Sequence, residues 1–133
     1  MARNVFLSFV EEDLNLANLF RGQARNANND LEFRDYSVKE PFNSTNAEYI
    51  KQQIRNLIDN VSVTLCLIGY NTHTSNWVNW EIETSALNLK GLVGVRLHSS
   101  QSDIPPSALG KYNGRVVNWD IPSIVRAIEQ AAK

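Results

Sequence analysis

The stretch Val61–Ile68 constrains the fold more than any other part of this sequence, because it is almost continuously apolar over the length of one strand. Strands with one solvated face alternate apolar and polar residues, whereas central parallel strands are buried on both faces and form unbroken apolar runs. Parallel neighbours also need a crossover connection, which is usually a helix. We therefore expect a parallel sheet with helices on both of its faces.

Short β-rich segments alternate with segments of helical periodicity along the chain, as this architecture requires. Strict alternation of five parallel strands with helices indicates an α/β fold of three layers, similar to flavodoxin. No linker or repeat divides the sequence, so we expect a single domain over residues 1–133. The expected strands are Asn4–Phe9, Leu31–Tyr36, Val61–Ile68, Leu92–Leu97 and Arg115–Val117.

The helical segments carry their own boundary signals. Thr45 and Glu48 have the spacing of a capping box, which predicts the start of the second helix. The third helix is expected over Asn76–Leu89, with Gly91 near its C-terminal cap. The loop between residues 98 and 113 has room for no more than one short turn of helix. The expected buried stripes include Leu16, Leu19, Phe20 and Ala24 in the first helix, and Val78, Ile82, Ala86 and Leu89 in the third.

Composition argues against several classes of function. The formal net charge of −1 gives no general attraction to nucleic acid or to acidic membranes. No apolar stretch approaches membrane-spanning length, and the N-terminus lacks the pattern of a secretory signal. The one cysteine, Cys66, allows no disulfide within the chain and fits a reducing compartment. We therefore expect a cytoplasmic protein whose partner is another protein or a small molecule.

Motifs of several enzyme classes are missing. Neither a GxGxxG fingerprint nor a P-loop occurs. His73 and His98 lie in separate loops without Cys, Asp or Glu partners at ligand spacing, so no metal site is expected. Cys66 lies inside the predicted central strand, where it is expected to act as a small hydrophobic residue. A phosphoacceptor receiver domain would need an aspartate where that strand ends, and this chain has Gly69 and Tyr70 there.

The ends of the predicted strands hold the candidate binding residues, because ligands of doubly wound sheets bind beyond the carboxyl ends of the strands. Ser8 and Phe9 end the first strand, and Arg34, Asp35 and Tyr36 end the second. Arg34 and Asp35 could equally form a surface ion pair of small energetic value. The strand ends alone do not decide between these interpretations.

The third helix offers the candidate catalytic residue. Trp77 and Glu81 lie four residues apart and therefore share a face. The adjacent apolar stripe should anchor the helix to the sheet, so that Glu81 projects beside the core toward the strand ends, while Glu83 faces solvent. Simpler interpretations are an acidic residue near a positive helix end and tryptophans, Trp77 and Trp80, that only pack.

At these residues the sequence resembles the TIR superfamily and, within it, the TIR-like proteins of bacterial Thoeris antiphage systems. VFLSF at 5–9 resembles the first-strand motif of the family, and LEFRDYSVKEPFNST at 31–45 resembles its second strand and the following loop. VTLCLIGYNTHTSNWVNWEIE at 63–83 is the closest match and contains the W-x-x-x-E motif. GLVGVRL at 91–97 continues the pattern.

The resemblance implies an enzyme that cleaves NAD, taken up as substrate, without a cofactor. The glutamate of the W-x-x-x-E motif is the essential catalytic residue of enzymatic members, which here is Glu81. By the same resemblance, Ser8 and Phe9 line the nicotinamide–ribose pocket. The end of the second strand and its loop border the nucleotide, which here points to Arg34, Asp35 and Tyr36. Enzymes of this type in Thoeris systems make a cyclic ADP-ribose isomer, a diffusible signal that activates a separate NAD-consuming effector protein.

This chemistry suits the residue types. Cleavage of the nicotinamide–ribose bond expels a neutral leaving group and gathers positive charge on the ribose, which a nearby carboxylate such as Glu81 can stabilise. Phe9 or Trp77 could stack on a ring of the nucleotide or exclude water. Capture of the intermediate by water gives ADP-ribose, and capture by a hydroxyl of the same nucleotide gives a cyclic isomer. The sequence does not decide between the two products.

Two other functions stay open on the sequence alone. The first is a non-catalytic TIR–TIR adaptor, in which Phe42 and Trp80 would form an interface and Glu81 would have no chemical role. Either function, adaptor or enzyme, is compatible with a homo-oligomer. The second is an enzyme similar to nucleoside deoxyribosyltransferases, which would use a related fold and a carboxylate on a different nucleoside.

Overall fold

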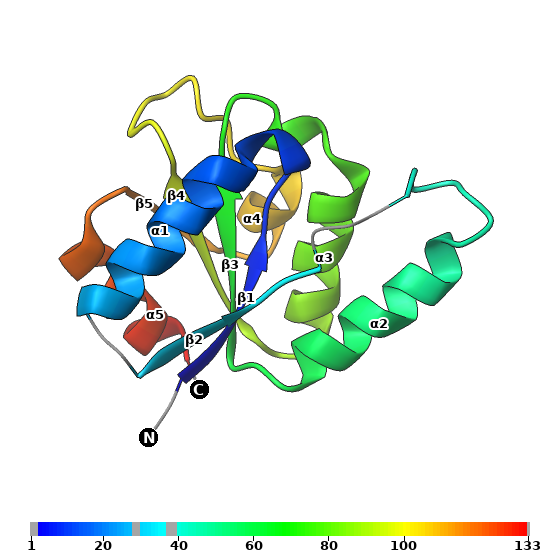
Figure 1. Ribbon diagram of the computed structural model, residues 1–133, viewed down its shortest axis with the longest axis horizontal. Helices are drawn as coiled ribbons and strands as arrows, with labels where there is room; N and C mark the ends of the chain where they lie inside the picture. Colours follow the sequence, from blue (N-terminus) through cyan, green and yellow to red (C-terminus); the bar gives the residue numbers. More distant parts are fainter. Residues whose placement is uncertain (1–2, 28–29, 37–39, 133) are drawn as a thin grey trace.

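A computed structural model describes residues 3–27, 30–36 and 40–132, and its strands form one parallel sheet (Figure 1). The strand order is β2-β1-β3-β4-β5, and every neighbouring pair is parallel. The predicted α/β fold similar to flavodoxin is therefore confirmed. The strands are β1 (Arg3–Ser8), β2 (Leu31–Arg34), β3 (Val63–Ile68), β4 (Gly91–Arg96) and β5 (Arg115–Asn118).

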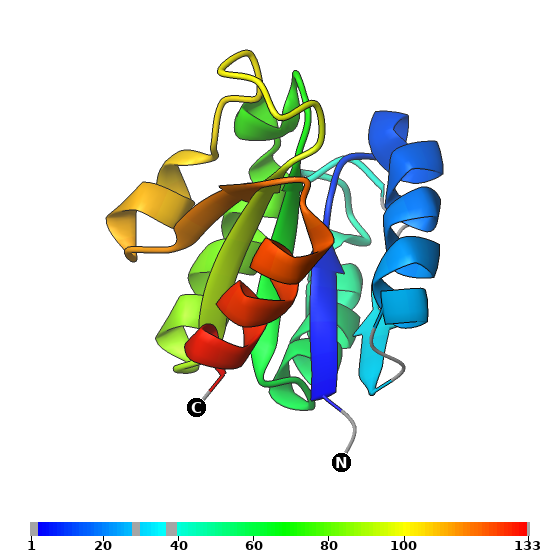
Figure 2. The same ribbon diagram turned by 90° about the vertical axis from the view of Figure 1, so that its left-hand side faces the viewer.

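Helices cover both faces of the sheet, which gives the three expected layers (Figures 1 and 2). α1 and α5 pack on one face, and α2, α3 and α4 pack on the other. Short 3-10 turns precede α1 and α3. The helices are α1 (Leu14–Ala27), α2 (Ala47–Asp59), α3 (Asn76–Leu87), α4 (Ser107–Lys111) and α5 (Ile121–Ala131).

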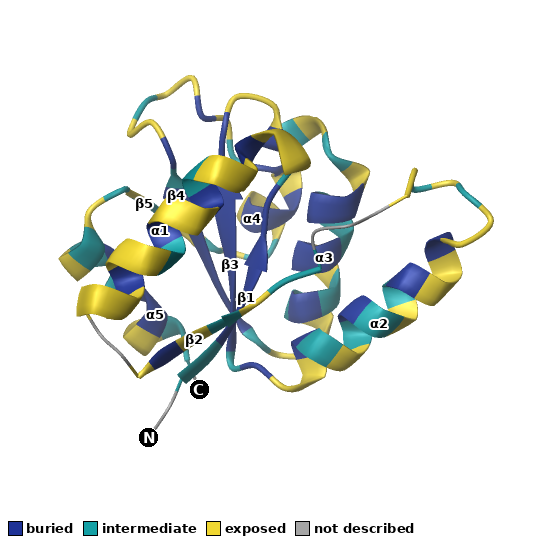
Figure 3. Ribbon diagram, viewed as in Figure 1, coloured by how far each residue is buried: buried dark blue, intermediate teal, exposed yellow. Residues whose placement is uncertain are grey.

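The central strand β3 behaves as its sequence predicts, because all six of its residues are buried (Figure 3). Side chains alternate between the two faces of a strand. Val63, Leu65 and Leu67 therefore join the core under α1 and α5, whereas Cys66 and Ile68 join the core under α3 and α4. The edge strand β2 is buried only in part.

The start of α2 differs from the prediction. The helix begins at Ala47, but Thr45 is not its cap and no capping box forms. Asn46 holds the N-cap position with right-handed helical backbone angles and makes no side-chain capping bond, whereas a capping residue usually has an extended backbone. The predicted polar loop Ser37–Asn46 is described only from Glu40 onward, since residues 37–39 lie outside the described part of the chain.

The end of α3 also differs from the prediction. The helix ends at Leu87, and Gly91 is the first residue of β4 rather than part of a cap. Leu89 takes the left-handed backbone conformation, with φ of 62°, that a cap glycine would usually take. Leu89 is 85 % exposed and Leu19 is 52 % exposed, so the prediction that both lie in buried stripes is wrong.

Along the chain, β2 is added on one side of β1 and β3 on the other. The direction in which strands are added therefore reverses between β1 and β3. Ligands of such sheets bind in the crevice at this switch point, beyond the carboxyl ends of the strands. Ser8, the last residue of β1, lies at this edge of the sheet. Within the described ranges, no helix combines the length and the apolar character needed to cross a bilayer.

Candidate active site

Glu81 and Ser8 meet at the carboxyl end of β1, although 73 positions separate them in sequence. The Ser8 hydroxyl donates a hydrogen bond of 2.6 Å to Oε1 of Glu81, and both residues are fully buried. This length lies in the range of charge-assisted O–H···O⁻ bonds. The candidate catalytic residue Glu81 and the candidate binding residue Ser8 are thus in direct contact next to the switch point of the sheet.

The local sequence of α3 explains why Glu81 faces the sheet. Ser75 caps the helix by accepting a hydrogen bond of 3.1 Å from the backbone N–H of Val78. Val78 and Ile82 then pack against β3 and β4 as the buried stripe predicts. Glu81 lies beside that stripe on the same turn and is carried into the interface with the sheet. Glu83 is exposed, as its position on the helix predicts.

Trp77 anchors the chain that follows β2. Its indole N–H donates a hydrogen bond of 2.8 Å to the backbone carbonyl of Glu40. Its ring packs edge-to-face on Phe42, at 4.9 Å between centroids, and on Trp80, at 6.0 Å. Trp77 is 8 % exposed, so the structure places it in a packed cluster one turn from Glu81 rather than on an open surface.

Phe9 lies on the opposite face of the sheet from Glu81. It packs in the core under α1 and α5, whereas Ser8 points toward α3. The reason is the alternation of side chains along an extended chain. The structure therefore brings only one of the two residues at the end of β1 to the carboxylate of Glu81.

Arg34, which ends β2, and the next two residues make contacts with groups other than Ser8 and Glu81. Arg34 does not pair with Asp35 but lies 4.0 Å from the carboxylate of Glu32 on the edge strand. Asp35 instead forms an ion pair with Arg21 of α1. Tyr36 packs against the cluster that holds Trp77. Of these three predicted nucleotide contacts, only Tyr36 shares a cluster with a residue of α3.

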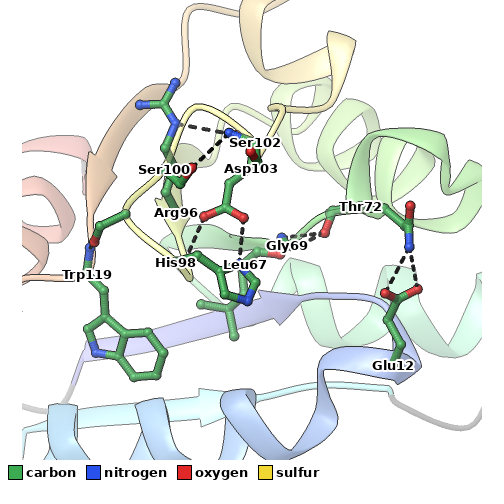
Figure 4. Close-up of polar contacts among 12 residues, drawn as sticks. Glu12, Leu67, Gly69, Thr72, Arg96, His98, Ser100, Ser102, Asp103 and Trp119 are labelled. Atoms are coloured by element: carbon green, nitrogen blue, oxygen red, sulfur yellow. Dashed lines mark hydrogen bonds and ion pairs between the residues drawn. The ribbon is translucent and has the colours of Figure 1, made fainter.

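A second polar cluster lies at the carboxyl ends of β3 and β4, and sequence reasoning missed it (Figure 4). Asp103 is fully buried and accepts two hydrogen bonds of 2.7 Å from His98, one from the backbone N–H and one involving ring Nδ1. The His98 ring stacks on Tyr70 at 4.0 Å between centroids. From the sequence, His98 is considered only as a metal ligand, and Asp103 is not identified as its partner. Asp103 lies in an irregular loop whose closure has no sequence signature.

Burial and nearby carboxyl groups also affect Cys66, a titratable group near the site. Burial raises the pKa of the Cys66 thiol, and the carboxyl groups of Glu81 and Asp13 raise it further. Cys66 is therefore a neutral, buried thiol and not a nucleophile. Among residues 3–27, 30–36 and 40–132, no group of three His, Cys, Asp or Glu side chains has the arrangement of a metal site.

Two hollows on the described part of the surface lie away from Glu81. A groove of about 640 Å³ runs along the amino ends of β4 and β5, between Leu89 and Ala131. A smaller hollow of about 400 Å³ lies beside Phe42 and Trp80. Neither includes Glu81, whose full burial closes the candidate site in this conformation.

A five-stranded parallel sheet in this order, with a glutamate of a W-x-x-x-E motif held at the switch point, is consistent with a TIR-like domain. Residues 6–102, well over half of the chain, match the family described as Thoeris protein ThsB, TIR-like domain. The chain belongs to this family, and membership supports a role in Thoeris defence. No curated protein matches the chain closely enough to count as a relative.

Proposed function

We propose that this chain cleaves NAD at the nicotinamide–ribose bond and releases a cyclic ADP-ribose isomer as a signal in antiphage defence. The signal would activate a separate NAD-consuming effector, and both steps would take place in the cytoplasm. The contact between Ser8 and Glu81 beside the switch point of the sheet carries this proposal. The family is compatible with NADase activity.

The proposed chemistry assigns Glu81 the central role. As nicotinamide leaves, positive charge develops on the ribose, and a carboxylate next to that ribose stabilises the transition state more than the ground state. A buried carboxylate acts in surroundings of low dielectric constant, where this interaction is stronger than in water. The leaving group is neutral, so the reaction needs no general acid.

The burial of Glu81 has a consequence for regulation. The side chain is fully buried, so a nucleotide can reach its carboxylate only after neighbouring side chains move apart. This supports an enzyme that turns over slowly at rest and accelerates after an infection cue exposes Glu81. Exclusion of bulk water from the same place would favour capture of the intermediate by a hydroxyl of the nucleotide over hydrolysis.

Glu81→Gln tests the proposal, because the change is nearly isosteric and removes only the charge. We expect it to abolish product formation while the melting temperature stays close to that of the wild type. Glu83→Gln is the matched control, since Glu83 lies on the same helix but is exposed. Mass-resolved chromatography of NAD after incubation, with purified protein and with lysate of phage-infected cells, measures substrate and product together.

The outcomes separate the open alternatives. A product of the mass of cyclic ADP-ribose that depends on Glu81 supports the proposal and its cyclisation step. Full turnover by Glu81→Gln would refute it. An absence of NAD loss in both preparations would favour the adaptor, which predicts an oligomer or complex that Phe42→Ala or Trp80→Ala disrupts. Cleavage of a deoxynucleoside in place of NAD would indicate the deoxyribosyltransferase-like enzyme.

A further inference from the structure

Two buried hydroxyl groups connect β3 to α3 one helical turn after Glu81. The Thr64 and Ser85 hydroxyl oxygens lie 2.6 Å apart, with Thr64 1 % exposed and Ser85 fully buried. The Ser85 hydroxyl also donates a hydrogen bond of 2.8 Å to the backbone carbonyl of Glu81. A serine hydroxyl has a single proton, so Ser85 uses it on that carbonyl and Thr64 must donate to Ser85.

Glu81 is consequently held from two neighbouring strands. Its carboxylate accepts a hydrogen bond from Ser8 of β1, and its backbone carbonyl is held through Ser85 by Thr64 of β3. In the register of the sheet, Ser8 is paired with Cys66, two residues after Thr64. Ser8 and Thr64 thus project from the same face of the sheet, the one that α3 covers.

Packing alone does not require these two hydroxyl groups. Valine and alanine would fill nearly the same volumes as Thr64 and Ser85, and replacing both partners of a buried hydrogen bond by apolar groups is often neutral for stability. Thr64 is also the polar exception in the strand sequence VTLCLI. A buried hydrogen-bonded pair instead selects one arrangement of the elements that it joins.

A serine in a helix often bonds to the carbonyl four residues earlier, so the bond from Ser85 to Glu81 would not by itself indicate a role. The contact with Thr64 changes this interpretation, because it ties the same hydroxyl to a different element. Rotation or sliding of α3 on β3 would break it. The Thr64–Ser85 pair therefore fixes both the position along the helix axis and the rotation of the turn of α3 that carries Glu81.

We propose that Thr64 and Ser85 are positioning residues for the NAD cleavage proposed above: they hold α3 against β3 so that the Glu81 carboxylate meets the ribose. The inference rests on the proposed function, and neither residue touches the substrate. A displacement of about 1 Å of a catalytic group can reduce a rate by about a hundredfold. Partial loss of the restraint should therefore be visible in kcat.

Kinetics of four variants test the role. Thr64→Val and Ser85→Ala should each lower kcat about tenfold with KM within about twofold of the wild type. The double variant should be no slower than the slower single variant, because the two residues act through one chain of hydrogen bonds. Thr64→Ser keeps the hydroxyl and loses a methyl group, so its kcat should stay near that of the wild type while its melting temperature falls.

Cys66→Ala is the packing control for these variants. It removes a buried group from the same strand and face as Thr64 without removing either hydroxyl, so it should lower the melting temperature and leave kcat close to the wild-type value. If Thr64→Val kept wild-type kcat while Thr64→Ser lost it, the methyl group and not the hydroxyl would matter, and the positioning role would be overturned.

A second measurement does not depend on turnover. The ¹³C resonances of the Glu81 backbone carbonyl and side-chain carboxyl report its position in the purified protein. We expect both to move in Thr64→Val, whereas a purely local role would move only the backbone carbonyl and would overturn the inference. Retained turnover in Glu81→Gln overturns the proposed function itself. Wild-type turnover in Thr64→Val beside an inactive Glu81→Gln overturns only the positioning role.

Discussion

Asp13 keeps a carboxyl group in surroundings that disfavour its charge. The residue is 7 % exposed, and its carboxyl lies over Gly69, where an added Cβ would come within 2.2 Å of Oδ2. Burial raises the pKa of this carboxyl above its ordinary value of 3.8, and Glu12 and Asp103 raise it further, although His98 opposes them. The ionised form of Asp13 therefore lowers the free energy of unfolding at neutral pH.

Asp13→Asn should accordingly stabilise the protein at pH 7. Because the folded pKa is raised, the fold binds this proton more tightly than the unfolded chain does. The unfavourable contribution of the Asp13 carboxylate to the free energy of unfolding is absent below the ordinary pKa of 3.8. It grows as the pH rises toward the pKa that Asp13 has in the folded protein. In denaturant unfolding, Asp13→Asn should have a higher free energy of unfolding than the wild type at pH 7, and this difference should disappear near about pH 3. Glu11→Gln removes the same charge from an exposed position, and an equal gain there would contradict the explanation.

Residue patterns indicated where Glu81 would point but not its contacts. The helical spacing directed Glu81 toward the strand ends, where Ser8 was also expected, and the hydrogen bond between the two side chains appears only in the structure. Strand alternation, applied to the same segment, would have placed Phe9 on the opposite face, where the structure has it. The pair His98–Asp103 was beyond prediction, because irregular loop geometry and not periodicity brings the two side chains together.

At the scale of elements, the number, type and order of strands and main helices followed from periodicity, while their ends did not. A strand end depends on where pairing with a neighbour stops, and β2 stops at Arg34 because its four residues pair with Arg3–Phe6 of β1. A helix end depends on a few backbone angles. The end of α3 shows this best, since a leucine takes the conformation expected of a cap glycine.

Leu89→Gly tests the cost of that helix end. The backbone N–H of Leu89 bonds to Ala86 and that of Lys90 bonds to Ser85, a Schellman motif with leucine at the left-handed position. Because Leu89 is 85 % exposed, glycine relieves backbone strain and loses little packing. We expect the free energy of unfolding to rise by about 1 kcal/mol. Leu87→Gly, at the last helical residue and also exposed, should instead lower it, by up to about 1 kcal/mol. Loss of stability in both would show that Leu89 makes contacts that outweigh its strain.

At the scale of the whole molecule, the two edges of the sheet have different roles. The carboxyl edge holds Ser8, Glu81 and the His98–Asp103 pair, which form hydrogen bonds between polar side chains. At the amino edge, beside the groove between Leu89 and Ala131, the end of α5 makes a close contact with β4. There an added Cβ on Gly91 would lie 2.3 Å from the backbone oxygen of Ala131, so the end of α5 lies directly on the start of β4. Changes at this edge should therefore alter stability without altering the site.

Gly91→Ala and Gly22→Ala test this separation as a matched pair. At Gly91 the new methyl group meets backbone atoms that cannot rotate away, so α5 must shift, and the free energy of unfolding should fall by about 2 kcal/mol. At Gly22, inside α1, nothing lies within 4 Å of the added Cβ, and the free energy of unfolding should rise by about 1 kcal/mol. Denaturant titration measures both changes.

NAD turnover per folded molecule should be the same in both variants as in the wild type, because neither glycine lies at the carboxyl edge. A lower turnover in Gly91→Ala at a temperature where it is fully folded would mean that the position of α5 reaches Glu81 through the sheet, and that the two edges are not independent.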